Sequence, residues 1–156
     1  MEPNEYRYVA SRVVFSGNEP VYYELALKGT EDLTDLDDGD TYIGFSVDSG
    51  LATIVDAQTI EIYNKFYEQW HINYPEKNIY DDYYSDLFQL NAMAYPQYQR
   101  SKGDWINFTI PDTELTVPMI QSGFGDGLYP VYWAFDKDGQ ICQIIMEYID
   151  CSEAYE

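Results

Sequence analysis

The sequence predicts an α+β fold: a mainly antiparallel β-sheet with two central helices packed on it, in a single domain. Strand-like segments occupy the first and last thirds of the 156 residues, and helical periodicity is confined to the middle third. Separate runs of strands and helices are typical of this class. The length also fits one domain, because single domains usually have about 100–150 residues. We expect residues 6–150 to form the ordered core, and residues 1–5 and 151–156 to form tails.

The first third of the chain contains short strands joined by turns. Tyr6–Phe15 and Pro20–Leu27 are rich in Val and Tyr, and the polar segment Ser16–Glu19 between them is typical of a turn. Two further strands are expected at Thr41–Val47 and Leu51–Val55.

The middle third predicts two helices. Asp56 can cap the first helix, because its carboxylate can accept hydrogen bonds from the free N–H groups of the first turn. Apolar residues then recur at three- and four-residue spacing along one face, at Ile60, Tyr63, Phe66, Tyr67 and Trp70. A second helix is expected over residues 81–94, before Pro96, with a buried side formed by Tyr84, Leu87, Phe88 and Met93.

The last third returns to strands. Candidates are Asp104–Ile110, Glu114–Gln121 and Tyr129–Phe135. The segment Asp136-Lys137-Asp138-Gly139 predicts a hairpin turn, because Asp and Gly tolerate the positive φ that such turns require. The strand that follows, Gln140–Ile149, is apolar on both faces, so we expect it to be central in the sheet.

The charge of the chain excludes several classes of partner. There are 28 Asp and Glu against 8 Lys and Arg, a formal net charge of −20, together with 17 Tyr. Nucleic acids and anionic membranes would be repelled by this charge, so neither is expected as a partner. No stretch approaches the roughly 20 apolar residues of a membrane helix. The acidic N-terminus lacks the basic start of a signal peptide, and we expect a cytoplasmic protein.

Catalytic and metal-binding motifs find little support. The single histidine, His71, lies at the expected end of the first helix, where the helix dipole favours a positive side chain. Cys142 and Cys151 are expected to be free thiols, because the strand between them holds them too far apart for a disulfide. An EF-hand loop built around Gly39 or Gly139 lacks its oxygen ligands. We therefore predict that the protein is not an enzyme and holds no metal or cofactor.

The glycine-rich segment Gly123–Gly127 is not a phosphate-binding loop. It lacks the Lys of a P-loop, no helix is expected after it, and Asp126 would repel a phosphate. We expect a tight turn that uses residues at unusual φ.

The remaining signal is an interaction surface that is acidic and rich in Tyr. Tyr and Trp are enriched at interfaces, and an acidic field speeds the capture of a basic partner. The acidic run 31–40 has a plainer interpretation as a solvated loop, and the tyrosines of 80–86 have one as core residues. We expect partner contacts at Asp35, Asp37, Asp38, Asp40, Asp81, Asp82, Tyr83 and Tyr84.

A motif in the last third resembles a known family. Ser122-Gly-Phe-Gly-Asp-Gly-Leu-Tyr-Pro-Val-Tyr-Trp133, followed by Phe135-Asp-Lys-Asp-Gly139, is similar to the C-terminal signature of a bacterial family called domain of unknown function 4241. Phe45-Ser-Val-Asp48-Ser-Gly50 is similar to another of its segments, and the resemblance covers most of residues 8–150. This chain has Phe124 and Ala52-Thr53 where that family's pattern differs. The motif residues are Gly123, Gly125, Asp126, Gly127, Tyr129, Pro130, Tyr132 and Trp133.

The resemblance implies no chemistry, because that family has no established activity. By analogy with other small acidic bacterial proteins, we predict an immunity-type protein that occludes a cognate toxin with a basic surface, most plausibly a nuclease. One alternative is a nucleic-acid mimic that inhibits many basic proteins. Another is a small-ligand or enzyme domain centred on Gly123–Trp133, with a pocket lined by Asp126, Tyr129 and Tyr132. The sequence leaves the oligomeric state open.

Overall fold

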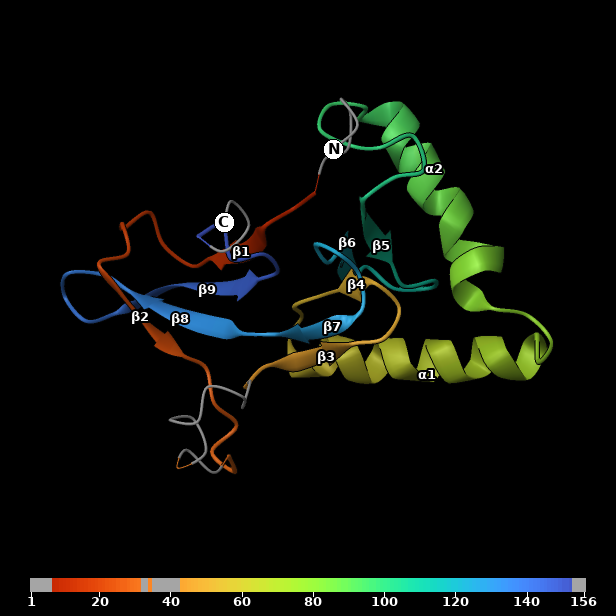
Figure 1. Cartoon of the computed structure of the whole chain (residues 1–156). Coiled ribbons are helices and arrows are strands. Elements are labelled where there is room, and N and C mark those ends of the chain that lie inside the picture. Colours follow the sequence, from red (N-terminus) through yellow and green to blue (C-terminus); the bar gives the residue numbers. More distant parts are fainter. Residues whose placement is uncertain (1–6, 32–33, 35–42, 153–156) are drawn as a thin grey trace. The chain divides into compact units, whose positions relative to one another are not determined.

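A computed structural model describes residues 7–31, 34 and 43–152 of the chain (Figure 1). The fold is α+β, and every strand pair of the described residues is antiparallel, so the predicted class is confirmed. The strands form three sheets instead of the single sheet expected. The chain divides into two compact units: a helical unit, Leu51–Gln121, and a sheet unit, which comprises the described parts of Arg7–Gly50 and Ser122–Glu156. The boundaries of a single domain stay a prediction.

The helical unit has a three-stranded sheet in the order β4-β6-β5, which makes β5 an edge strand. Two helices and a short π-helical turn lie between β4 and β5 in the sequence. The elements are β4 (Leu51–Ala52), α1 (Ala57–Asn73), the π-helical turn η2 (Tyr80–Tyr84), α2 (Ser85–Ala94), β5 (Trp105–Thr109) and β6 (Thr116–Gln121).

Helix α1 begins at the predicted cap. One carboxylate oxygen of Asp56 accepts the Thr59 N–H at 2.9 Å, and the other accepts the Thr59 hydroxyl at 2.7 Å. The Thr59 hydroxyl and N–H stabilise the ionised carboxylate, which lowers the pKa of Asp56. The predicted apolar face is also confirmed, since Trp70 is buried and the half-buried residues Tyr63, Phe66 and Tyr67 pack against the same core.

The second helix differs from the regular helix expected over residues 81–94. The Ser85 N–H donates to the carbonyl oxygen of Tyr80, an i→i+5 bond that defines η2, and α2 continues from there. Phe88 is buried as predicted, but the prediction for Met93 is wrong, because this side chain is 73% exposed. Met93 lies five residues beyond Phe88, away from its helix face, whereas Ala92, four residues beyond, is buried.

The core of the helical unit lies on one face of its sheet. In the β5–β6 register, Ile106 pairs with Met119 and Phe108 pairs with Val117. Because side chains alternate along a strand, these four share one face of the sheet. Both helices contribute to the same buried cluster, through Trp70 of α1, Tyr84 of η2 and Phe88 of α2.

The turn into β5 depends on an ion pair with a buried carboxylate and on a glycine. Asp104 is 1% exposed, and its carboxylate accepts the Arg100 backbone N–H and the Arg100 Nε–H, both at 2.6 Å. Gly103 has φ +87°, and a Cβ there would lie 2.2 Å from the carbonyl oxygen of Phe88. Only glycine therefore allows α2 to lie this close to the turn.

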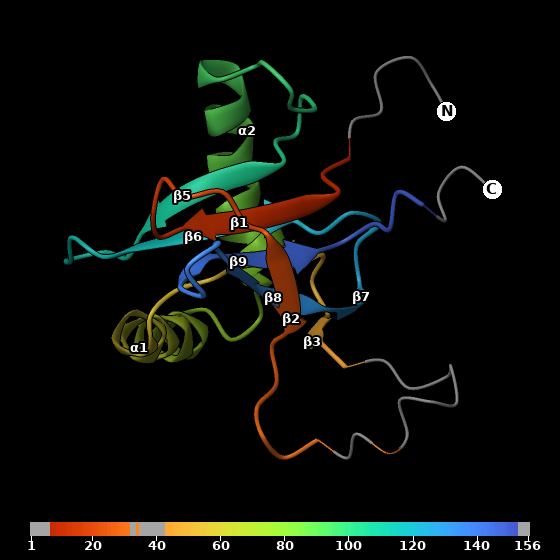
Figure 2. The same ribbon diagram turned by 90° about the vertical axis from the view of Figure 1, so that its left-hand side faces the viewer.

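The sheet unit contains a four-stranded sheet in the order β1-β9-β8-β2 and a separate β3-β7 pair (Figure 2). Strand β9 lies between two neighbours, so the prediction that it is central is confirmed. The predicted strand Tyr129–Phe135 is divided at Pro130, which has no N–H to donate to a ladder. The elements are β1 (Ala10–Val14), β2 (Tyr22–Leu25), β3 (Phe45–Val47), β7 (Gly127–Tyr129), β8 (Val131–Phe135) and β9 (Ile141–Glu147).

The predicted hairpin turn between β8 and β9 is held by Asp136. One oxygen of its carboxylate accepts the N–H groups of Asp138 and Gln140, each at 2.9 Å, and the other accepts the Asn18 amide at 2.8 Å. These bonds, the one from Gln140 foremost, stabilise the ionised form and lower the pKa of Asp136.

Candidate partner-binding surface

The predicted contact residues fall in two segments of the chain. Asp35, Asp37, Asp38 and Asp40 lie outside the described residues. The second group, Asp81, Asp82, Tyr83 and Tyr84, lies on η2 in the helical unit. These four side chains differ in exposure and in hydrogen bonding.

Asp82 helps to start η2. Its carboxylate accepts the Asn78 N–H at 2.8 Å, while the Asn78 side-chain oxygen accepts the Tyr80 N–H at 2.9 Å. These two hydrogen bonds satisfy two N–H groups near the beginning of the helix, which would otherwise lack a partner. Asp82 is exposed and is at the same time a capping residue.

Asp81 is the freer of the two carboxylates. It is exposed, and it has no hydrogen bond or ion pair with any other residue that the structure describes. A negative charge in the first turn of a helix is favoured by the helix dipole. The side chain is therefore available to a cationic group on a partner.

Tyr84 is buried, as the helix pattern predicts, and this burial argues against its predicted contact role. Its side chain is 1% exposed, and its hydroxyl lies 2.9 Å from the hydroxyl of Tyr63. Burial disfavours the charged phenolate and raises the pKa of Tyr84 well above its ordinary value. A bulky aromatic side chain is needed here to fill the core between α1 and β5, so it cannot reach a partner.

Tyr83 lies at the boundary between core and surface. It is half-buried, and its ring lies 6.1 Å from the ring of Phe66 on α1 and 6.1 Å, edge-on, from that of Phe108 on β5. These contacts fix the ring while part of it remains exposed. Asp81, Asp82 and part of Tyr83 are the exposed groups of this half of η2, and we call these three residues the η2 surface.

A groove that the sequence did not predict lies between α2 and β5. It has a volume of about 400 Å³, and its lining combines apolar side chains with amide and hydroxyl groups. The three-residue spacing of Leu87 and Leu90 places both leucines on one side of a helix, and this much can be read from the sequence. The groove also requires β5 to be an edge strand, which only the sheet order shows. The lining residues are Leu87, Leu90, Asn91, Ile106, Asn107, Phe108 and Thr109.

The family motif in the sheet unit forms a tight turn. The Gly125 N–H and the Ser122 carbonyl oxygen are 2.6 Å apart, and the Tyr129 hydroxyl donates to the Gly125 carbonyl oxygen at 2.6 Å. Gly123 and Gly125 have φ of +45° and +109°, as expected for this turn. Asp126 accepts the Gly50 N–H at 2.8 Å and so ties the turn to the chain before β4.

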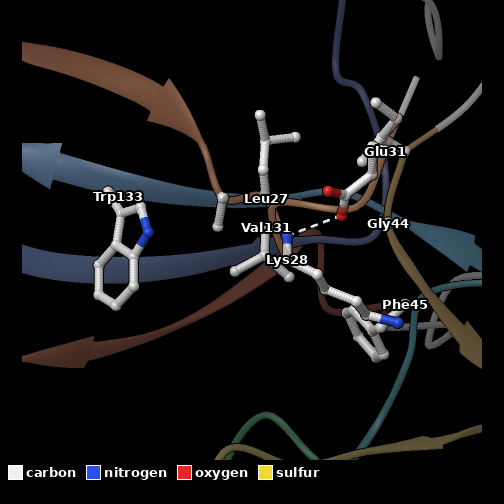
Figure 3. Close-up of a pocket in the computed structure, with 9 residues that line it drawn as sticks. Leu27, Lys28, Glu31, Gly44, Phe45, Val131 and Trp133 are labelled. Atoms are coloured by element: carbon white, nitrogen blue, oxygen red, sulfur yellow. Dashed lines mark hydrogen bonds between the residues drawn. The ribbon is translucent and has the colours of Figure 1, made fainter. Parts of the chain in front are cut away.

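A cavity of about 230 Å³ lies in the sheet unit beside β8 (Figure 3). It is lined by Phe45, Val131 and Trp133 among others, and not by Asp126, Tyr129 or Tyr132, the lining expected for a ligand-binding motif. Glu31 at its rim accepts the N–H groups of Lys28, Gly29 and Thr30. These bonds, the one from Lys28 foremost, lower the pKa of Glu31, and they engage its carboxylate in the turn.

The comparison with family models agrees with the motif. The model of a protein of unknown function, DUF4241, matches residues 1–146. The chain belongs to the DUF4241 family. No curated protein and no solved structure matches it. For this DUF4241 protein the signature has a structural explanation, since Gly123, Gly125, Asp126 and Tyr129 build one turn.

The other chemical groups of the DUF4241 chain have ordinary environments. His71 lies in the last turn of α1, as predicted, with its Nδ1 3.0 Å from the Tyr67 carbonyl oxygen. Cys142 is buried and Cys151 exposed, and both are free thiols, as expected. Within the described part of the chain, no three His, Cys, Asp or Glu side chains gather where they could hold a metal ion. None of the helices described is both long and apolar enough to cross a membrane.

Proposed function

We propose that this DUF4241 protein acts by binding, as an immunity-type inhibitor that occludes a cognate toxin with a basic surface, most directly a nuclease. The observation that carries this proposal is the excess of carboxylates. With 28 Asp and Glu against 8 Lys and Arg, acidic residues outnumber basic ones by twenty. Such a field attracts basic proteins and speeds their capture.

A nuclease is the basic partner that this charge fits best. Its active site holds the phosphates of nucleic acid through Lys and Arg side chains, and carboxylates can occupy the same positions. Bonds between carboxylates and guanidinium or ammonium groups are stronger than neutral hydrogen bonds. An acidic protein can therefore compete directly with the substrate.

The η2 surface supplies a local form of this chemistry. Asp81 presents a carboxylate without a partner among the described residues, and Tyr83 presents part of a ring that the core holds in place. Tyrosines held in place by a core are typical of the few residues that provide most of the affinity at an interface. Both side chains lie in the helical unit, on the same π-helical turn.

The test uses the protein encoded next to this one, produced in an inactive form, as the binding probe. We compare two charge reversals in the same unit, Asp81→Lys on η2 and Glu68→Lys on α1. Both residues are exposed, and both variants change the net charge equally. The proposal expects Asp81→Lys to weaken binding about tenfold and Glu68→Lys to weaken it less than threefold.

Three other outcomes decide against parts of the proposal. Absence of binding by the wild type at low salt overturns the function. Equal binding to unrelated basic nucleases favours a nucleic-acid mimic over a cognate inhibitor. Equal effects of the two reversals remove the η2 surface from the interface. Asp35, Asp37, Asp38 and Asp40 stay a separate prediction, which a variant with all four changed to Lys tests independently.

A further inference from the structure

The outer edge of β5 carries backbone groups that no strand among the described residues uses. Along β5 and its flanking residues, the even-numbered residues form the hydrogen bonds to the β6 side. The Asp104 carbonyl oxygen accepts the Gln121 N–H at 2.8 Å, and the Ile110 N–H donates to the Leu115 carbonyl oxygen at 2.9 Å. Pro118, which has no N–H, stands opposite Asn107. In an antiparallel ladder the alternate residues point their N–H and C=O groups the other way. Those of Asn107 and Thr109 therefore point away from β6.

Helix α2 closes only the first part of this edge. The Asn91 side-chain amide donates to the carbonyl oxygen of Trp105 at 2.7 Å, which satisfies the first outward group. The backbone groups of Asn107 and Thr109 have no such hydrogen bond to another residue that the structure describes. Among the described residues, the free edge thus begins beside the groove between α2 and β5.

The wall of the groove opposite the free edge is apolar. Leu87 is half-buried and Leu90 is 61% exposed, and both line the groove together with Ile106 and Phe108. A strand added to β5 would place every second side chain on the face of Ile106 and Phe108, next to the two leucines. The length from Asn107 to Thr109 corresponds to about 10 Å of extended chain. Backbone pairing and apolar pockets for alternate side chains are the two parts of recognition by strand addition.

The residues next to the groove in the chain are acidic, which favours a basic segment as the occupant of the groove. Lys and Arg are absent from its lining, and acidic residues adjoin it in the chain: Asp86 precedes Leu87, while Asp112 and Glu114 follow Thr109. All three acidic side chains are exposed. We propose that this groove takes up an extended segment of the basic partner, with apolar residues at alternate positions and Lys or Arg at its ends, which adds as a strand to the edge of β5. This inference rests on the proposed function and specifies how that partner is held.

Two measurements test the inference with the same inactive partner protein. The first compares Leu90→Arg, which places a bulky positive charge in the groove, with Met93→Arg on the same helix. Met93 is 73% exposed and does not line the groove. Leu90→Arg is expected to weaken binding at least tenfold, and Met93→Arg less than threefold. Thermal unfolding of both variants checks that they are folded.

The second measurement needs no variant. Amide hydrogen exchange of the wild type, with and without the partner, is expected to slow at Asn107 and Thr109 when the partner binds. If the partner binds but these amides are not protected and Leu90→Arg binds like Met93→Arg, strand addition is overturned while the proposed function stands. If protection appears at the other edge strands, such as β2, the site is wrong. If the wild type does not bind the partner at all, the proposed function fails and the inference fails with it.

Discussion

Replacing Tyr84 with alanine tests whether this residue belongs to the core or to the surface. The side chain is 1% exposed and lies among Tyr63, Tyr83 and Phe108, so Tyr84→Ala leaves a large cavity. Truncation of a buried aromatic side chain costs about 3–5 kcal/mol of unfolding free energy. At about 2–4 °C per kcal/mol for a chain of this size, the melting temperature should fall by about 6–20 °C. The milder Tyr84→Phe removes only a hydroxyl and should cost about 1 kcal/mol, because the Tyr63 hydroxyl loses its partner.

Thermal and urea unfolding followed by tryptophan fluorescence measure this loss, because Trp70 lies in the same buried cluster. Tyr23→Ala is the control, since Tyr23 is 54% exposed and its removal should change the unfolding free energy by no more than about 0.5 kcal/mol. Tyr84→Phe should also leave binding of the partner within about twofold of the wild type. A melting temperature for Tyr84→Ala equal to that of Tyr23→Ala would refute the assignment of Tyr84 to the core.

Two further predictions concern buried and hydrogen-bonded carboxylates. Asp104→Ala removes the acceptor of the turn before β5, while Arg100, whose side chain is 33% exposed, keeps its hydrogen bond to Gln121. Urea unfolding should therefore show a loss of about 1–3 kcal/mol; a loss below about 0.5 kcal/mol would contradict this role. The pKa of Asp136 is lowered in the folded state, so its contribution to stability is complete above the ordinary carboxyl pKa and is lost as the pH falls through the lowered value. Asp136→Asn should therefore be less stable than the wild type at pH 7, with the difference shrinking below about pH 4; a difference that is constant with pH would count against it.

Local patterns in the sequence identified the features that depend on residues a few positions apart in the chain. Asp56 caps α1 as its position predicts, and the spacing of Tyr63, Phe66 and Trp70 identifies the buried face of that helix. The Asp136 turn and the central place of β9 followed from composition alone. These features depend on residues close together in the chain, which is why the sequence is sufficient for them.

The predictions that differ from the structure do so because of contacts between residues far apart in the chain. The helix pattern predicts the burial of Tyr84, but the half-buried position of its neighbour Tyr83 follows only from the packing of η2 against α1 and β5. Met93 lies off the helix face that the sheet covers. The division of one predicted strand at Pro130, and the pairing of its halves with different partners, likewise depend on strands distant in sequence.

The candidate site was only partly predictable for the same reason. The acidic character and the segment 80–86 follow from composition, and Asp81 stands on an exposed turn as that view requires. The groove beside Leu90 could not be predicted, because it needs α2 and the free edge of β5 to lie next to each other. Sequence patterns identify the residues of α2 and of β5 that line the groove, but they do not show that the two elements lie side by side.

Capture of a cognate toxin with a basic surface is the function we propose. Isothermal titration calorimetry of the wild-type protein against the inactive protein encoded next to it tests this most directly, at about 50 mM and about 500 mM salt, where screening differs strongly. We expect a saturable complex at low salt whose affinity falls as salt rises, because capture of the toxin depends on opposite charges. No heat of binding at low salt, or an affinity that does not change with salt, would contradict it.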